Sequence, residues 1–212
     1  MNKALAAMAA ALPLALSGCG SLLESSVAAP QTYVLRLPGA AASGAAITVG
    51  SVLVQRPEAG PGLDSNRIAL LRSDRRFDFY AASLWAAPTP DLVEALVVDA
   101  LRNTGTFSAV FDDSAPYAPR YDLRITLRRF EADYTNERNG PGGTAPTVRV
   151  VLDCTLGRHR DRALLASFTA QGAVPATEDR LSSIVAAFET AAATAMAEVA
   201  RNVTATVAAD KT

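Results

Sequence analysis

Two cysteines and one histidine are the residues of this 212-residue chain best suited to covalent, acid–base or metal chemistry. Cys19 follows Leu16-Ser17-Gly18, Cys154 lies in an alternating apolar segment, and His159 lies in a charged stretch. A zinc site usually needs about four cysteine, histidine or carboxylate ligands, and a Ser-His-Asp triad needs a histidine held on a rigid scaffold. We therefore expect no catalytic residue, no metal site, no cofactor and no enzymatic activity.

The residues around Cys19 are typical of a secretion signal. Lys3 is the only charged residue before the cysteine, and an apolar run from Ala4 to Leu16 follows it. This run is shorter than the roughly 20 residues that a membrane-spanning helix needs, and it ends in small residues as signal peptides do. Leu16-Ser17-Gly18-Cys19 resembles a bacterial lipobox, which implies a signal peptide over residues 1–18 and a lipid attachment site at Cys19. An ordinary signal peptide that happens to contain a cysteine is the alternative.

A lipidated Cys19 would anchor the chain to a membrane. The lipobox implies a lipid on the thiol and an acyl chain (palmitate) on the new amino terminus, and two acyl chains already give stable attachment. Gly20 follows the cysteine instead of an aspartate, which implies the periplasmic face of the outer membrane. The Ser- and Ala-rich residues 19–30 are expected to be a flexible tether that spans roughly 15–20 Å. After Leu16 we expect no segment that crosses a bilayer.

Composition limits the remaining function classes. The formal net charge is −1, so the chain lacks the basic stripe of a nucleic-acid-binding protein. The mature chain is long enough for one domain with a hydrophobic core, which we expect over residues 31–208. If Cys19 carries lipid, Cys154 has no disulfide partner, and we expect it to be a small buried side chain.

The elements that must position these residues are predicted from apolar periodicity. Short strands are expected over residues 33–37, 47–54, 66–72, 77–80 and 107–111. One helix is expected to begin with Thr89 as its N-cap and to end at Asn103-Thr104-Gly105. A second, longer helix is expected from about Asp179 to beyond Val199.

Three longer strands are expected in the second half of the chain. Residues 121–134, 148–157 and 164–170 alternate between apolar and polar side chains, with Leu164 on the core face. The apolar phase of the first strand changes near Arg128-Arg129, where a bulge would keep both halves on the core side. The three strands predict an antiparallel meander with one polar face. With two helices on a mostly antiparallel sheet, the fold class is an α+β single-domain sandwich.

The remaining candidate residues have simple structural interpretations. Gly140-Pro141-Gly142-Gly143 lacks the lysine and following helix of a phosphate loop and is expected to be a turn. Asp112-Asp113 and Asp74 are expected in solvated loops, and His159 at a solvated hairpin tip. Trp85 has two interpretations, a core anchor or a contact with a partner protein, since aromatic residues are enriched at the centres of interfaces.

In order and spacing, these segments resemble the ABC-type transport auxiliary lipoprotein family (PqiC-like). The resemblance covers nearly all of the mature chain, and the segment from Asn66 to Trp85 is its most specific part. The matching features after Cys19 are Tyr33-Val34-Leu35, Val49 to Arg56, Asp64-Ser65-Asn66-Arg67-Ile68, Tyr80 with Leu84-Trp85-Ala86, the helix with Leu92, Leu96 and Leu101, Phe107-Ser108-Ala109-Val110, and Tyr121-Asp122-Leu123.

This resemblance implies a function that depends on partners. Such lipoproteins accompany an MCE-domain protein, an inner-membrane permease and an ATPase, which together move phospholipid or other hydrophobic molecules between membranes. The lipoprotein is expected to dock to the MCE component, and some relatives form homo-oligomeric rings. Three alternatives stay open: a periplasmic lipid carrier, an assembly lipoprotein for lipopolysaccharide or outer-membrane proteins, and a hydrolase.

Overall fold

The computed structural model describes residues 29–37, 49–135 and 145–210 of the chain. The expected signal peptide, Cys19, most of the tether and the Gly140–Gly143 turn lie outside the described residues. Every described helix and strand lies between Gln31 and Ala209, and so does every residue of the buried core. A chain that begins at residue 20 therefore keeps the whole described fold.

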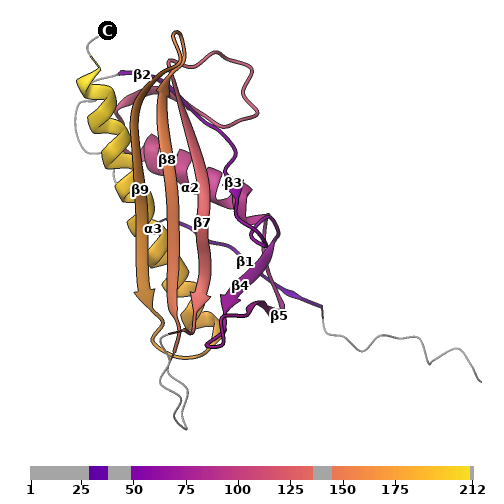
Figure 1. Cartoon of the computed structure of the whole chain (residues 1–212). Coiled ribbons are helices and arrows are strands. Elements are labelled where there is room, and N and C mark those ends of the chain that lie inside the picture. Colours follow the sequence, from indigo (N-terminus) through magenta and orange to yellow (C-terminus); the bar gives the residue numbers. More distant parts are fainter. Residues whose placement is uncertain (1–28, 38–48, 136–144, 211–212) are drawn as a thin grey trace, which may run out of the picture.

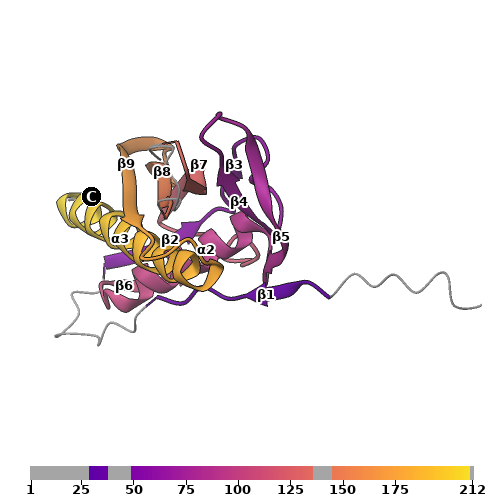
Figure 2. The same ribbon diagram turned by 90° about the horizontal axis from the view of Figure 1, so that it is seen from below.

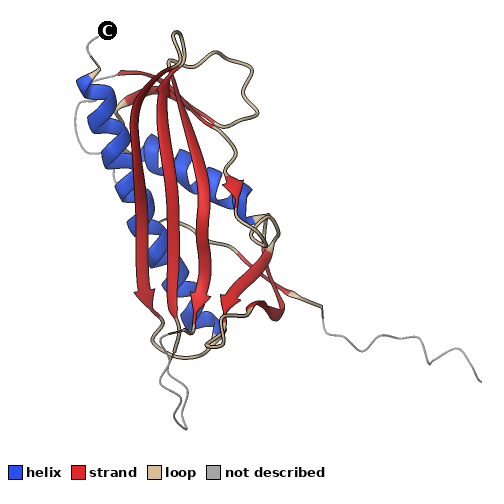
Figure 3. Cartoon of the chain, viewed as in Figure 1, coloured by secondary structure: helices blue, strands red, loops and turns tan. Residues whose placement is uncertain are grey.

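The described residues contain nine strands and two helices. The strands are β1 (Gln31–Tyr33), β2 (Val49–Val54), β3 (Glu58–Ala59), β4 (Arg67–Leu71), β5 (Phe77–Trp85), β6 (Phe107–Phe111), β7 (Tyr121–Asp133), β8 (Thr147–Arg158) and β9 (Ala163–Pro175). The helices are α2 (Thr89–Asn103) and α3 (Leu181–Ala209). Figure 3 shows the three long strands β7, β8 and β9 with α3 running alongside them.

Strand β7 is the centre of the sheet because both of its edges are paired. One edge is antiparallel to β8 over its whole length, and β8 is in turn antiparallel to β9. The other edge is shared in sequence by β2 near its start, β3 in its middle and β4 at its end, all of them parallel to β7 (Figure 1). Beyond these, β6 pairs with β2, and β5 pairs with β4 and β1. The sheet is therefore mixed: β7, β8 and β9 pair antiparallel, as do β4 and β5, and the remaining pairings are parallel.

Both helices pack on one side of this sheet, as Figure 2 shows. Helix α3 lies against β8 and β9, and α2 contacts α3, β2 and β6. Periodicity explains this arrangement, since the buried positions of α3 recur every three or four residues. They are Ile184, Ala187, Phe188, Ala191, Ala192, Ala195, Met196, Val199, Ala200, Val203 and Val207. The expected α+β fold with two helices on the sheet is confirmed.

Small side chains set the distance between α3 and the sheet. Gly172 of β9 lies directly beneath Ala191, and a Cβ at Gly172 would come within 2.0 Å of the Ala191 carbonyl oxygen. The close approach allows the alanines of α3 to fill the interface with little volume. By length and composition α3 could cross a membrane, which the sequence did not lead us to expect. However, 56% of its apolar segment is buried in the fold. We interpret it as the core helix of the domain.

The bulge expected near Arg128-Arg129 is confirmed. The register between β7 and β8 shifts between Leu127 and Arg129, and Leu127 and Phe130 on either side of the bulge are both buried. A second register shift was not expected. Gly157 of β8 pairs with Leu164 while Leu156 pairs with Ala166, so Leu164 turns to the outer face and is 66% exposed. The prediction that Leu164 faces the core is therefore wrong.

Several expected element boundaries also differ from the structure, since β5 continues to Trp85 and β9 to Pro175, beyond the expected residues 80 and 170. The first strand ends at Tyr33, and Leu35 is buried without being part of a strand. At α2 the residue before the helix is Pro88, and the Thr89 hydroxyl donates to the Ser65 carbonyl oxygen at 2.9 Å instead of capping the helix. The helix ends as expected, with Gly105 in the left-handed region (φ 64°) two residues beyond Asn103.

Candidate functional site

The lipid attachment site at Cys19 lies outside the described residues, so it stays a prediction. The same holds for the boundaries of the signal peptide and of the tether. The other sequence-predicted candidates, Trp85, Cys154, His159 and Asp112-Asp113, all lie in described parts of the chain. The structure separates them from one another, and each has its own local environment.

Trp85 is a core residue. It ends β5 with 1% of its surface exposed, and its ring packs edge-to-face on Phe188 at 5.1 Å and on Phe130 at 6.0 Å between ring centroids. Its indole Nε1 has no hydrogen-bond partner among the described residues. A partner contact, the second interpretation of Trp85, does not fit a side chain that is enclosed by β7 and α3.

Cys154 is buried within β8, as the alternating pattern predicts. Burial raises the pKa of its thiol to about 12, and the nearby carboxylates of Asp153 and Glu198 act in the same direction. Because the thiolate is the reactive form, this cysteine is poorly suited to nucleophilic chemistry.

His159 lies at the β8–β9 turn with 48% of its side chain exposed. Its Nδ1 is 2.8 Å from a carboxylate oxygen of Asp122. Among the described residues, no serine, threonine or cysteine side chain is hydrogen-bonded to the ring. The pair resembles the base and the orienting acid of a triad in type, but the nucleophile that would make it catalytic is not beside it.

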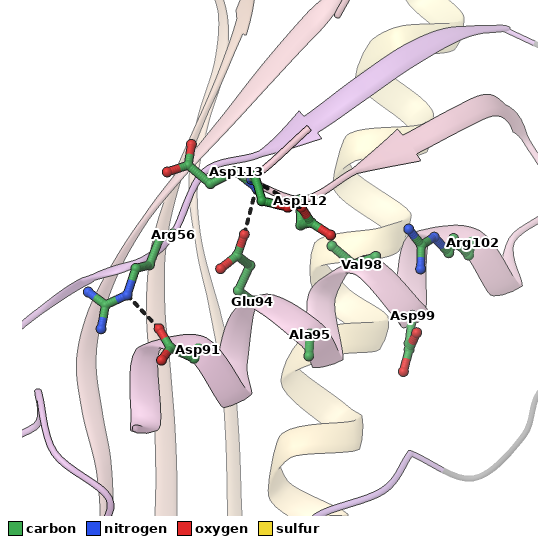
Figure 4. A pocket seen from close by; sticks show the side chains of 10 residues that line it. Arg56, Asp91, Glu94, Ala95, Val98, Asp99, Arg102, Asp112 and Asp113 are labelled. Carbon is green, nitrogen blue, oxygen red and sulfur yellow. Dashed lines mark hydrogen bonds and ion pairs between the residues drawn. The ribbon is translucent and has the colours of Figure 1, made fainter. Parts of the chain in front are cut away.

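Five carboxylates and two arginines line a hollow of about 530 Å³ between the exposed face of α2 and the chain that follows β2 and β6 (Figure 4). They are Asp91, Glu94, Asp99, Asp112, Asp113, Arg56 and Arg102. Several of them are engaged within the chain: Arg56 pairs with Asp91 and Asp64, and Glu94 accepts a hydrogen bond from the Asp113 amide at 2.8 Å. The loop containing Asp112-Asp113 is thus tied to α2.

Glu94 is a carboxylate of this hollow whose pKa is shifted upward. Burial raises its pKa, and the carboxylates of Asp112 and Asp113 add to the rise, against the hydrogen bond from the Asp113 amide. A raised pKa in a hollow can mark an acid catalyst. The Ser114 hydroxyl in the same hollow donates to Asp112, and among the described residues no cluster of histidine, cysteine and carboxylate side chains is arranged to hold a metal ion.

Two polar networks were not predicted from the sequence. In a hollow of about 580 Å³, the Tyr80 and Tyr134 hydroxyls are 2.7 Å apart, and Tyr134 donates to Asp179 at 2.7 Å. Burial raises the pKa of Tyr134, and both hydrogen bonds add to the rise. The contact joins β5, β7 and the approach to α3, which are distant in sequence, so no local pattern could have revealed it.

The second network lies on the outer face of β7 and β8. Glu131 and Asp133 are buried there at 5% and 4% exposure, and Arg129 and Arg149 bind them. Burial raises the pKa of Glu131, against the effect of Arg129. For Asp133, burial acts to raise the pKa, but hydrogen bonds from Thr135, Arg129 and Arg149 outweigh it and lower the pKa to about 2. Because every charge is paired, we interpret this cluster as structural.

Another hollow is apolar and lies between the two helices. Its volume is about 360 Å³, and it is lined mostly by Leu37, Met196 and the alanines of α2 and α3. Its size is at the lower end of small-molecule sites, which hold roughly 300–1,000 Å³. Taken together, the described surfaces offer sites for binding and pairing but no assembled set of catalytic groups.

Comparison with known proteins is consistent with a binding role. The family model of the ABC-type transport auxiliary lipoprotein component matches residues 33–200. A crystal structure of a protein from Xanthomonas campestris is similar over 85% of this chain and 98% of its own, with 26% sequence identity and a TM-score of 0.75. An uncharacterized protein of known structure shares the fold at 17% identity, over 82% of this chain and 99% of its own, with a TM-score of 0.61. No curated protein sequence matches the chain.

Proposed function

Because the chain belongs to the family of ABC-type transport auxiliary lipoprotein components, we propose that it is the lipid-anchored, non-enzymatic subunit of such a transport system. In this proposal Cys19 holds the domain on the periplasmic face of the outer membrane. The domain docks to the MCE-domain protein, which works with a permease and an ATPase to move phospholipid or another hydrophobic solute. The observation that carries the proposal is the family match over residues 33–200, which spans almost the whole described core.

The sequence before the domain supports the anchoring part of the proposal. Cys19 ends Leu16-Ser17-Gly18-Cys19, and only eleven residues separate it from Gln31, the first residue of β1. A tether of this length extends to at most roughly 36–40 Å. The folded domain would therefore stay close to the bilayer and still have room to turn toward a partner.

The described groups support a non-enzymatic role. Cys154 is buried with a raised pKa, His159 is bound to Asp122, and the Ser114 hydroxyl in the hollow of Glu94 donates to Asp112. Many charged side chains in the polar hollows pair with one another, as Arg56 does with Asp91 and Arg72 with Asp78, which is usual for protein surfaces. Chemistry in this system is expected to reside in the ATPase, with this chain providing attachment and docking.

Co-purification tests the docking part. We expect an affinity tag after Thr212 to recover the MCE-domain protein from detergent-solubilised membranes, after mild cross-linking in intact cells. An unrelated outer-membrane lipoprotein with the same tag serves as the control for nonspecific capture. Deletion of the gene is expected to weaken the outer-membrane barrier and to leave ATP hydrolysis by the permease complex intact. Repeated purification without any MCE-domain protein would refute the docking proposal.

A lipid carrier is the second candidate, and the apolar hollow between α2 and α3 is the observation that favours it. Native mass spectrometry of a chain that begins at residue 20 separates the two functions. A carrier should retain a phospholipid through purification, whereas a docking subunit should have the mass of the bare chain. Since the hollow holds only about 360 Å³, we expect the bare mass.

A further inference from the structure

One end of the outer sheet face carries a basic hollow, at the point where β7 begins and β8 turns into β9. The hollow has a volume of about 880 Å³, and four arginines and a histidine line it against one carboxylate, Asp122, among the described lining residues. The basic residues are Arg124, Arg158, His159, Arg160 and Arg162. Arg124 is on the outer face because its neighbours Leu123 and Ile125 point into the core. The hollow therefore opens on the side away from α3.

The basic residues of the hollow differ in how closely they pair with carboxylates of the same chain. Arg158 binds Asp210 at 2.6 Å and Asp161 at 2.8 Å, so its charge is used within the fold. Arg160 is only within 4.0 Å of Asp161. Arg124 and Arg162 have no ion-pair partner in the described part of the chain. This excess of positive charge favours an anionic occupant.

One apolar side chain lines the hollow beside these arginines, and a second lies on a neighbouring connection, where its ring packs on Phe111. Leu164 lines the hollow and is 66% exposed because the register shift opposite Gly157 turns it outward. Tyr117, also 66% exposed, lies on the connection between β6 and β7, and the hydrogen bond from the His159 amide to the Arg120 carbonyl holds that connection against the β8–β9 turn. Two of the four large exposed hydrophobic residues of the described chain therefore lie at this end, which projects beyond the rest of the sheet in Figure 1.

We propose that this basic end, consisting of Arg124, Arg160, Arg162, Leu164 and Tyr117, is a membrane-contacting surface that binds anionic phospholipid headgroups. Arginines pair with the phosphates, while the leucine and the tyrosine enter the interface between headgroups and acyl chains. An acidic protein segment would satisfy the arginines equally well, but a projecting end with apolar residues among its cations fits a flat, amphipathic surface better. The inference goes beyond the proposed docking function and depends on the proposed anchor only for proximity to a bilayer.

Vesicle flotation tests the inference with a chain that begins at residue 20, which lacks Cys19 and any lipid of its own. The probes are vesicles of phosphatidylcholine alone and of phosphatidylcholine and phosphatidylglycerol in equal parts. Each arginine near an anionic surface contributes about fivefold to binding, so the triple variant Arg124→Gln, Arg160→Gln, Arg162→Gln should bind on the order of a hundredfold more weakly. Leu164→Ser should weaken binding roughly tenfold, because an inserted leucine is then lost.

A matched triple variant removes the same net charge at exposed arginines elsewhere on the domain and should bind nearly as well as the wild type. Its substitutions are Arg36→Gln, Arg180→Gln and Arg201→Gln. Raising NaCl from about 0.1 M to 1 M shortens the screening length from about 10 Å to 3 Å and should release the wild-type protein. Urea unfolding of each variant checks that it is folded.

Three results would overturn the inference. They are equal wild-type binding to both kinds of vesicle, equal weakening by the two triple variants, and binding to a polyglutamate peptide without binding to the anionic vesicles. The last result would assign the surface to an acidic protein partner. Failure here leaves recovery of the MCE-domain protein unaffected, so it is distinguishable from failure of the proposed function.

Discussion

Gly172 provides the sharpest test of how α3 and the sheet are held together. A Cβ at this position would lie 2.0 Å from the Ala191 carbonyl oxygen and 2.8 Å from its carbonyl carbon, whereas real Cβ contacts essentially never fall below 3.0 Å. The clash involves the backbone of α3, so no side-chain rotation can relieve it. In a Gly172→Ala variant, helix and strand must therefore move relative to each other until this contact exceeds 3.0 Å.

The magnitude follows from the packing around Ala191. A gap of 0.5–1 Å removes about a quarter to a half of the dispersion energy between facing atoms. Phe188 and Ala195, one turn to either side of Ala191, are fully buried and would share this loss. Overpacked cores usually lose about 1–3 kcal/mol. Because a rigid backbone takes up the whole displacement here, we expect the upper end of that range, about 3 kcal/mol.

Gly157 of β8 is the matched control. It also lies in a strand, but a Cβ there would meet only the Ala163 carbonyl oxygen at 3.5 Å, an ordinary contact. Gly157→Ala should be neutral or stabilise by up to about 1 kcal/mol, because alanine restricts the unfolded chain more than glycine does. Urea unfolding, followed by circular dichroism, gives the free energy of unfolding of each variant. An m-value equal to that of the wild type checks that unfolding stays two-state. Equal stabilities of the Gly172→Ala and Gly157→Ala variants would refute the close approach of α3 and β9.

Three further predictions concern buried groups. Asp133→Asn should destabilise the domain by about 2 kcal/mol near neutrality, since the pKa of Asp133 falls from its ordinary 3.8 to about 2 on folding. A lowered pKa gives stability above 3.8 that is lost as the pH falls through 2, so urea midpoints of wild type and variant should converge in strong acid; a constant difference would contradict the assignment. Trp85→Ala should cost about 3–5 kcal/mol, and Trp85→Phe about 1–3 kcal/mol, because the phenyl ring leaves a smaller cavity and the indole nitrogen, which has no partner among the described residues, loses no hydrogen bond; equal losses in the two variants, measured by urea unfolding with circular dichroism, would contradict this prediction. In a chain that begins at residue 20, Cys154 should resist a thiol reagent until urea unfolds the domain, and rapid labelling of the native protein would contradict its burial.

Local sequence patterns predicted the long strands well. The alternation from Val148 to Leu156 places every second side chain in the core, and the change of phase near Arg128 identified the bulge of β7 because both halves of that strand had to face one side. The same reasoning missed the bulge at Leu164. Ala166 and Phe168 continue the alternation without interruption, so the register shift depends on pairing with Gly157 and leaves no mark in the sequence of β9 itself.

Pairings between distant segments could not be predicted. That β2, β3 and β4 share one edge of β7 follows from where their chain connections lead, which no local periodicity encodes. Surface chemistry was hidden for the same reason. The basic end combines Arg124 of β7 with the β8–β9 turn, and the Tyr80–Tyr134–Asp179 contact joins three elements. The sequence could name the charged turn around His159, but not the strand face that completes it.

The most direct test of the account is whether the domain needs its anchor. In cells that lack the native gene, the wild-type chain and a Cys19→Ser chain exported through a conventional, cleavable signal peptide are compared for membrane fractionation and for restoration of the outer-membrane barrier. The account predicts that the wild type fractionates with the outer membrane and restores the barrier, whereas the unanchored domain is released into the periplasm and restores little of it. Full restoration by a released Cys19→Ser domain would contradict a lipid-anchored docking subunit.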